Sequence, residues 1–207
     1  MRKSTLTLKS LSNSKKSTVG RKRSNKSHSA IIKATQELLY EVGFDKLSIE
    51  RVAAKAGVGK STIYRWWESK ASLAIEAFLE YLTPIIEFPE TGSAADDLLN
   101  QINKVAEAYR EKPGKIIREI IALGQFDEST ISYFVTGYLE PRRTAAKIVL
   151  KRGVSNNEFN NDIDIDIVVD SLYGPIFHRM LTRHAAIDEA FVDSHVKLIL
   201  RAIKPDD

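Results

Sequence analysis

The sequence predicts an all-α protein, in which a small three-helix unit precedes a larger helical part. Apolar residues recur at helical spacing along most of the chain after residue 27, and no long stretch alternates apolar and polar residues as a half-buried strand does. Gly43, Gly57 and the segment from Pro84 to Pro89 separate the periodic segments. At 207 residues and 43% apolar content, the chain is long enough to bury a sizeable core.

Two helices are predicted first. Ser27 or Ser29 can cap a helix whose apolar face consists of Ile31, Ala34, Thr35, Leu38 and Val42. After a short link, Ser48 is a good N-cap for a second helix over Ile49–Ala56. This second helix is rich in alanine, which allows two helices to cross closely, as in a helix-turn-helix.

A third, short helix is predicted from Lys60 to about Trp67, after the turn at Gly57. At about 100° per residue, Ile63 and Trp67 share the core face. The opposite face carries two hydroxyls and an arginine, flanked by two aromatic rings: Ser61, Thr62, Arg65, Tyr64 and Trp66. A short helix with these side chains is suited to the major groove of DNA.

The letters "GKST" at Gly59–Thr62 also come close to a nucleotide-binding P-loop. That loop needs a further glycine five residues earlier, where this chain has Ala54, and it must follow a buried strand. Here the preceding segment is helical, so we interpret the glycines as a turn between two helices.

Positive charge is concentrated at the N-terminus. Residues 1–36 hold ten of the 31 Lys and Arg residues and no acid, so the rest of the chain is acidic although the net charge is +4. A basic end on an acidic body indicates a polyanionic partner, most often nucleic acid. Residues 1–26 are too polar to fold alone, and we expect a disordered basic arm that raises non-specific DNA affinity. An organelle transit peptide has a similar composition and is the alternative.

The larger part, residues 73–207, is predicted to form helices over residues 94–111, 115–126, 130–152, 165–184 and 190–203, after a helix over 70–82. Lys112-Pro113-Gly114 is predicted as a turn. No window approaches eighteen apolar residues, so we expect no transmembrane helix, and there are no cysteines to form disulfides or thiolate metal sites.

The alternating segment Asp162–Ile167 resembles the start of a calcium loop. Such a loop needs glycine at its sixth position and glutamate at its twelfth, where this chain has Ile167 and Tyr173. We expect these acids to cap the next helix instead. The four histidines are scattered, and no catalytic or metal-ligand spacing is present, so neither an enzyme nor a cofactor is predicted.

The run from Ala34 to Leu73, "ATQELLYEVGFDKLSIERVAAKAGVGKSTIYRWWESKASL", closely resembles the DNA-binding domain of TetR-family transcriptional regulators. We therefore assign residues 27–72 to this domain. The resemblance implies that Tyr64, Lys70 and Ser48 contact phosphates. Base edges are expected to meet Ser61, Thr62 and Arg65, with Lys60 reading bases or positioning the helix and Trp66 beside them. Members of the family commonly have other residues at Gly59–Thr62 and Trp66, so the base-reading face is individual to this chain.

The C-terminal segment, with "PRR", "RG" and "LYGPIFHRML", resembles the C-terminal domain of one large TetR subgroup. This resemblance implies a homodimer paired through the last two helices and a pocket for a small-molecule effector. Candidate aromatic residues for the pocket are Tyr109, Phe126, Phe134, Tyr138, Tyr173 and Phe177.

The resulting hypothesis is a cytoplasmic, homodimeric regulator, most often a repressor, that binds a palindromic operator in double-stranded DNA and responds to an effector. Two alternatives are a non-regulatory architectural DNA-binding protein, which relies on the basic arm, and a nucleotide-binding enzyme that uses the Lys60 segment.

Overall fold

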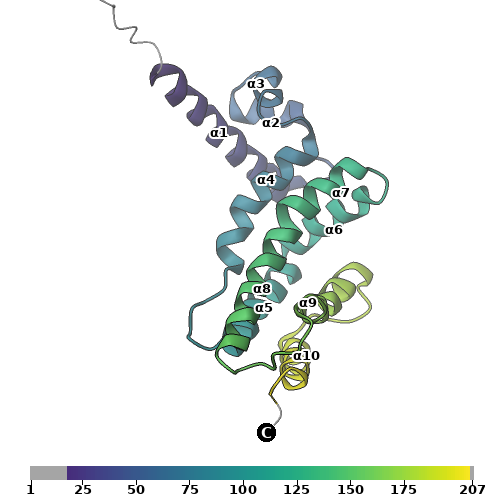
Figure 1. Cartoon of the computed structure of the whole chain (residues 1–207). Coiled ribbons are helices and arrows are strands. Elements are labelled where there is room, and N and C mark those ends of the chain that lie inside the picture. Colours follow the sequence, from purple (N-terminus) through teal and green to yellow (C-terminus); the bar gives the residue numbers. More distant parts are fainter. Residues whose placement is uncertain (1–17, 206–207) are drawn as a thin grey trace, which may run out of the picture.

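The computed structural model describes residues 18–205, and side chains from residue 25 onward. Within this range the chain is helical, without strands. The first four helices are α1 (Thr18–Val42), α2 (Ile49–Ala56), α3 (Lys60–Tyr64) and α4 (Lys70–Leu82). Figure 1 shows α2 and α3 together at one end of the elongated molecule, with α1 and α4 beside them.

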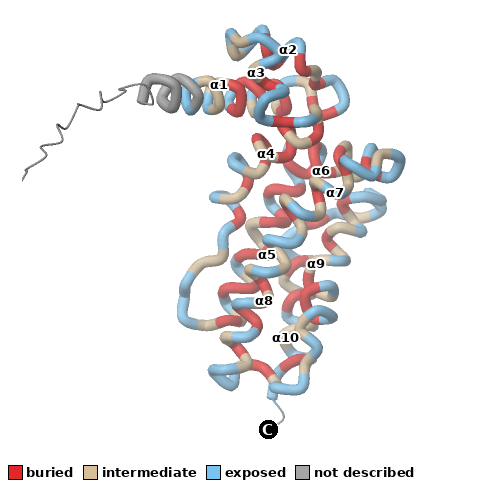
Figure 2. The backbone as a smooth tube through the Cα atoms, turned by 45° about the horizontal axis from the view of Figure 1, so that its top comes forward, coloured by how far each residue is buried: buried red, intermediate tan, exposed pale blue. Residues whose placement is uncertain are grey.

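The larger part contains α5 (Ala94–Arg110), α6 (Lys112–Gly124), α7 (Glu128–Phe134), α8 (Glu140–Ser155), α9 (Ile165–Thr182) and α10 (Glu189–Ala202). A 3-10 turn, Thr83–Ile86, follows α4, and a π-helical turn, Val135–Leu139, joins α7 to α8. Buried residues line the inner faces of these helices in both parts of the molecule (Figure 2). The all-α class and the two-part order predicted from the sequence are confirmed.

Helix α1 begins at Thr18, earlier than the predicted start at Ser27 or Ser29. Residues 18–26, which the sequence analysis placed in a disordered arm, are therefore helical. No proline interrupts this stretch, so the helix that packs from Ile31 onward can extend toward the N-terminus. The rest of the expected arm, residues 1–17, lies outside the described residues.

Two boundaries in the larger part also differ from the sequence prediction. Lys112-Pro113-Gly114 forms the first turn of α6 rather than a loop, because proline is tolerated where the helical N–H has no partner. Gly114 permits this close start, since a Cβ there would lie 2.0 Å from the carbonyl oxygen of Tyr109. The helix predicted over 130–152 is divided by the π-helical turn.

Carboxylates fix the starts of two helices in this part. Asp164 caps α9 by accepting hydrogen bonds from the backbone N–H groups of Asp166 and Ile167, which confirms the capping role predicted for this acidic segment. Glu158, from the connection after α8, accepts hydrogen bonds from the N–H groups of Ala94 and Ala95 at the start of α5, at 3.0 and 3.2 Å. These contacts hold α5, α8 and α9 in position around the interior described below.

Candidate nucleic-acid interface and ligand cavity

The α2–α3 segment has the backbone geometry of a helix-turn-helix. Ser48 caps α2 by accepting a hydrogen bond from the N–H of Arg51. Gly57 ends α2 in the left-handed region, with φ of 66°, which glycine adopts without steric cost. The chain then turns through Gly59, and α3 begins without a side-chain cap, with the N–H of Thr62 bonded to the Gly59 carbonyl at 2.9 Å.

The α3 segment presents the side chains that the helical spacing predicts. Ile63 and Trp67 are buried, and Tyr64 and Trp66 are 54% and 41% exposed. Ser61 and Arg65 are exposed, and Thr62 is partly buried. The helix is shorter than predicted: it ends at Tyr64, and the N–H groups of Trp66 and Trp67 both donate to the carbonyl of Ile63.

The basic side chains around α3 differ in their partners. Lys60 pairs with Glu50 at 3.0 Å on the exposed surface. The Lys70 ammonium donates to the carbonyl oxygens of Phe44 and Asp45, at 3.2 and 3.4 Å, and lies 4.7 Å from the centre of the Phe44 ring. Within the described part of the chain, the side chain of Arg65 makes no hydrogen bond or ion pair.

A cluster that the sequence analysis did not identify fixes the end of the α3 segment. His28 of α1 lies edge-on to Trp66, with ring centroids 5.0 Å apart, and 4.8 Å from Trp67. Glu76 of α4 accepts a hydrogen bond from the Trp67 indole N–H at 2.7 Å and contacts the His28 ring nitrogen at 3.1 Å. The residues of this cluster come from α1, the α3 segment and α4, so no local sequence signal links them.

Two hydrogen bonds connect this N-terminal unit to the larger helical part. The backbone N–H of Phe44 donates to the carboxylate of Glu119 on α6 at 2.6 Å. The hydroxyl of Tyr133 on α7 donates to the carboxylate of Glu68, just before α4, at 2.9 Å. The orientation of α2 and α3 is therefore tied to α6 and α7.

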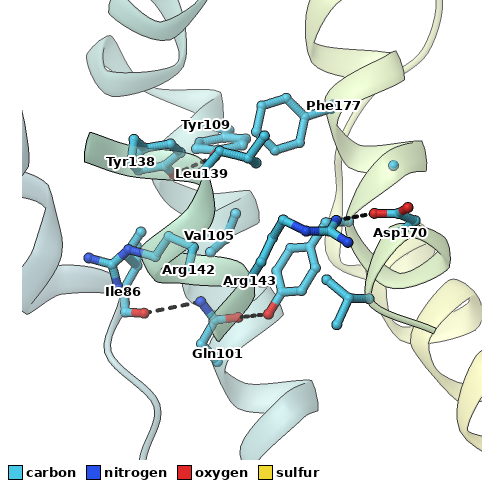
Figure 3. Close-up of a pocket in the computed structure, with 13 residues that line it drawn as sticks. Ile86, Gln101, Val105, Tyr109, Tyr138, Leu139, Arg142, Arg143, Asp170 and Phe177 are labelled. Atoms are coloured by element: carbon cyan, nitrogen blue, oxygen red, sulfur yellow. Dashed lines mark hydrogen bonds and ion pairs between the residues drawn. The ribbon is translucent and has the colours of Figure 1, made fainter. Parts of the chain in front are cut away.

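The larger part contains a partly open cavity of about 230 Å³, lined by residues of α5, the π-helical turn, α8 and α9 and by Ile86 (Figure 3). Four of the predicted aromatic residues line it: Tyr109, Tyr138, Tyr173 and Phe177. Two predicted pocket residues do not. Phe126 is 93% exposed, because it follows the end of α6 in a surface turn, and Phe134 is buried behind Tyr138, on which it stacks.

Polar groups on the cavity wall form short hydrogen bonds. The hydroxyls of Tyr109 and Tyr138 are 2.5 Å apart, and Tyr173 donates to the side-chain carbonyl of Gln101 at 2.6 Å. Burial raises the pKa of Tyr138 to about 12 and also raises the pKa values of Tyr109 and Tyr173, so all three remain protonated phenols at neutral pH.

Two arginines of α8 also line the cavity and were not predicted from the sequence. They leave α8 in opposite directions, Arg142 toward Ile86 and Arg143 toward Asp170 of α9 (Figure 3). Arg143 forms ion pairs with Asp170 and with Asp166, the latter at 2.8 Å. Neighbouring residues in the sequence thus end in different electrostatic environments.

No group of three or more potential metal ligands occurs among residues that the structure describes. In the same part of the chain, no helix is long and apolar enough to cross a membrane.

Comparisons with known proteins agree on one family. Residues 31–77 match the family described as "Bacterial regulatory proteins, tetR family", and residues 88–199 match "Tetracyclin repressor-like, C-terminal domain". YdeS of Bacillus subtilis, named as an uncharacterised HTH-type transcriptional regulator, is 35% identical over 89% of this chain and 92% of its own. A DNA-binding transcriptional repressor TetR of Mycobacteroides abscessus is 29% identical over 85% of this chain and 93% of its own.

A solved structure is similar over the same extent. The TetR family transcription regulator SCO0332 superposes with a TM-score of 0.79, at 31% identity, and covers 87% of this chain and all of its own. The helix-turn-helix and the larger helical part therefore occur in the same order in both molecules.

Proposed function

Because this chain belongs to the TetR family of bacterial transcriptional regulators, we propose that it is a homodimeric repressor whose binding to a palindromic operator is modulated by a small-molecule effector. Membership of the family makes the chain a DNA-binding regulator rather than an enzyme. The observation that carries the proposal is the exposed α3 surface, on an N-terminal unit that hydrogen bonds join to α6 and α7 of the part that contains the cavity. As a regulator of bacterial DNA it would act in the cytoplasm.

For DNA recognition, we assign base contacts to Arg65, Ser61 and Thr62, and phosphate contacts to Tyr64 and Ser48. Arginine bound to guanine is the commonest specific contact in the major groove, and Arg65 has no competing partner in the described chain. Lys60, Trp66 and Lys70 lie at the margin of this surface. Lys60 uses one and Lys70 two of the three ammonium donors for contacts within the protein, so each keeps a donor for a phosphate.

Dimerisation is supported by the apolar side chains that α9 and α10 leave exposed. Ile167 and Leu198 are 63% and 64% exposed, and Leu181 is 43% exposed. Ile167, Gly174 and Leu181 recur at helical spacing along one face of α9, so they can meet the same face of a second copy. A two-fold dimer would present two α3 segments to two half-sites.

Effector control requires that the ligand bind two arrangements of the molecule with different affinity. Tyr138 on the cavity wall and Tyr133, which contacts Glu68, lie at and just before the same π-helical turn. A ligand that moves this turn would change the contact to the DNA-binding unit. The repressor named among the relatives is consistent with a role in repression.

Selection of preferred sequences from random DNA, with the purified protein, tests the proposal. We expect a palindrome whose half-sites lie about one helical turn apart, and an affinity that falls steeply with salt. Recovery of no symmetric site, or binding that is independent of salt, would contradict it.

The alternative of an architectural DNA-binding protein is distinguished by removing residues 1–17. An architectural protein that relies on its basic arm loses most of its DNA affinity in this truncation. A regulator that reads bases through α3 retains its preference for the selected palindrome over a scrambled duplex, at lower affinity.

A further inference from the structure

The cavity wall carries one positive charge that the protein does not neutralise. The charge of Arg143 is balanced by Asp170 and Asp166. The Arg142 guanidinium instead donates to the neutral hydroxyl of Thr83 at 2.6 Å, and no carboxylate in the described chain lies within ion-pair distance of it. Arginine has five N–H donors, so Arg142 keeps donors that can hold a ligand oxygen.

The rest of the wall favours an apolar ligand body. Besides the tyrosines, the cavity is lined by Ile86, Val105, Leu139, Val169 and Phe177. Tyr109 and Phe177 meet edge to face, with ring centroids 5.5 Å apart, in an arrangement that continues readily onto a further ring. Beside such a largely apolar wall, an uncompensated guanidinium gains more from an anionic partner than it would in water.

The cavity wall also offers hydrogen-bond donors to a ligand but no unpaired carboxylate among its lining residues. The hydroxyls of Tyr109 and Tyr138 share one hydrogen bond, so one of their two protons is left to donate. The only lining carboxylate, that of Asp170, is already paired with Arg143. A cationic ligand would therefore approach Arg142 without a free counter-charge.

The size of the cavity limits the ligand. A buried apolar cavity of roughly 150 Å³ holds benzene. At about 230 Å³, this one has room for a single ring with a short substituent.

We propose that the effector is a small organic acid, with one carboxylate held by Arg142 and an aromatic or short apolar body packed against the Tyr109–Phe177 pair. This inference rests on the proposed effector-controlled function, and it adds the chemical class of the effector. Arg142 supplies the charge-assisted hydrogen bonds, and Arg143 closes the α9 side through Asp170.

Calorimetric titration of the full chain with benzoate, phenylacetate and 3-phenylpropionate tests the inference. Each acid is compared with its amide and with the amine of the same carbon skeleton. We expect at least one acid to bind, and to bind about tenfold or more tightly than its amide, while the amines do not bind.

Arg142→Met keeps the apolar stem and removes the charge. We expect it to lower the affinity for the acid by about tenfold to a hundredfold and to leave the affinity for the amide unchanged. The matched control is Lys151→Met, which removes a charge from an exposed position on the same helix, away from the cavity. This control should bind the acid as the wild type does.

The inference is overturned if no acid of the series binds, if amide and acid bind equally, or if Arg142→Met binds the acid as tightly as the wild type. Operator affinity of the unliganded protein, measured by fluorescence anisotropy, tests the proposed function separately. A protein that binds its palindrome but rejects every acid refutes the effector class and leaves the DNA-binding role intact.

Discussion

At the scale of single residues, Arg65 and Lys70 show how the fold divides positive charges between structure and recognition. Lys70 bridges the start of α4 to the carbonyl oxygens of Phe44 and Asp45, so its removal would loosen the joint between α1 and α4. Arg65 is exposed next to Tyr64, without a partner in the described chain. A loss of binding in a Lys70 variant would therefore be ambiguous, whereas an Arg65 variant reports on DNA.

Arg65→Ala is expected to weaken binding to the selected operator by about 1–3 kcal/mol, which is roughly fivefold to 150-fold, with a smaller effect on a scrambled duplex. The reason is that a base contact acts only on the preferred sequence. Anisotropy titrations with both duplexes measure the ratio. Lys55→Ala is the control, because its charge is already paired with Glu37 and Glu41. Equal losses on both duplexes would assign Arg65 to the backbone instead.

The outward face of α3 was predictable from spacing alone, because Ile63 and Trp67 are the only large apolar residues that can share its core face. The roles of His28 and Arg142 were not predictable from the sequence. His28 depends on Glu76, 48 positions away, and Arg142 on Thr83, 59 positions away. Phe126 shows the converse: its apolar character suggested burial, but its position after α6 leaves it exposed.

At the scale of elements, the π-helical turn Val135–Leu139 connects the cavity to the DNA-binding unit. Tyr138 within it lines the cavity, while Tyr133, just before it, reaches Glu68. Single π-helical turns inside α-helices are rare and frequently occur at functional sites. The sequence predicted one continuous helix here, because apolar residues recur at helical spacing on both sides of the turn and no glycine–proline break marks it.

Tyr133→Phe is expected to retain ligand binding in the cavity but to reduce the ligand's effect on operator affinity by about twofold to fivefold, part of a typical coupling free energy of 1–3 kcal/mol. The variant removes only the hydrogen bond to Glu68. Operator titrations with and without the bound acid measure the coupling. Ser155→Ala is the control, since its hydroxyl bonds only within α8, to the carbonyl of Lys151, away from the π-helical turn. An unchanged coupling in Tyr133→Phe would exclude this route.

The start of α5 predicts a pH dependence of stability. Burial pushes the pKa of Glu158 upward, but hydrogen bonds from Ala94, Ala95 and Ser93 outweigh it and hold the pKa below its ordinary value of 4.5. A carboxylate with a lowered folded-state pKa stabilises the protein above that ordinary value, and the contribution is lost as the pH falls through the folded pKa.

Glu158→Gln is therefore expected to lower the free energy of unfolding by about 1–2 kcal/mol at pH 7, because the amide accepts fewer of these hydrogen bonds. The difference should shrink as the pH falls below 4.5. Urea unfolding at fixed protein concentration measures both values. Glu128→Gln, an exposed acid in the first turn of α7, is the control and should change stability by only a few tenths of a kcal/mol. A pH-independent difference would contradict the assignment.

At the scale of the whole molecule, the sequence predicted the class and the order of the two parts because helical periodicity is local. The wrong predictions concern the boundaries between helices and the members of the cavity wall. Lys112-Pro113-Gly114 was predicted as a turn from composition, yet Gly114 can approach the Tyr109 carbonyl closely and lets α6 begin at once. The cavity, likewise, required the relative placement of three helices.

Leu198→Arg is expected to convert the proposed dimer into a folded monomer. Leu198 is 64% exposed on α10, so the single chain tolerates the charge, whereas a second copy packed on this face would bury it without a partner. Light scattering at micromolar concentration measures the mass, and circular dichroism checks that the helices remain.

The same variant should bind the palindromic operator at least a hundredfold more weakly, because two half-sites are no longer bound by one linked pair of α3 segments. Phe126→Arg is the control: it changes a side chain that is 93% exposed at the turn between α6 and α7 and should remain dimeric with full operator affinity. If Leu198→Arg stays dimeric, the α9–α10 face is not the interface, and the pairing of the α3 segments must come from another surface.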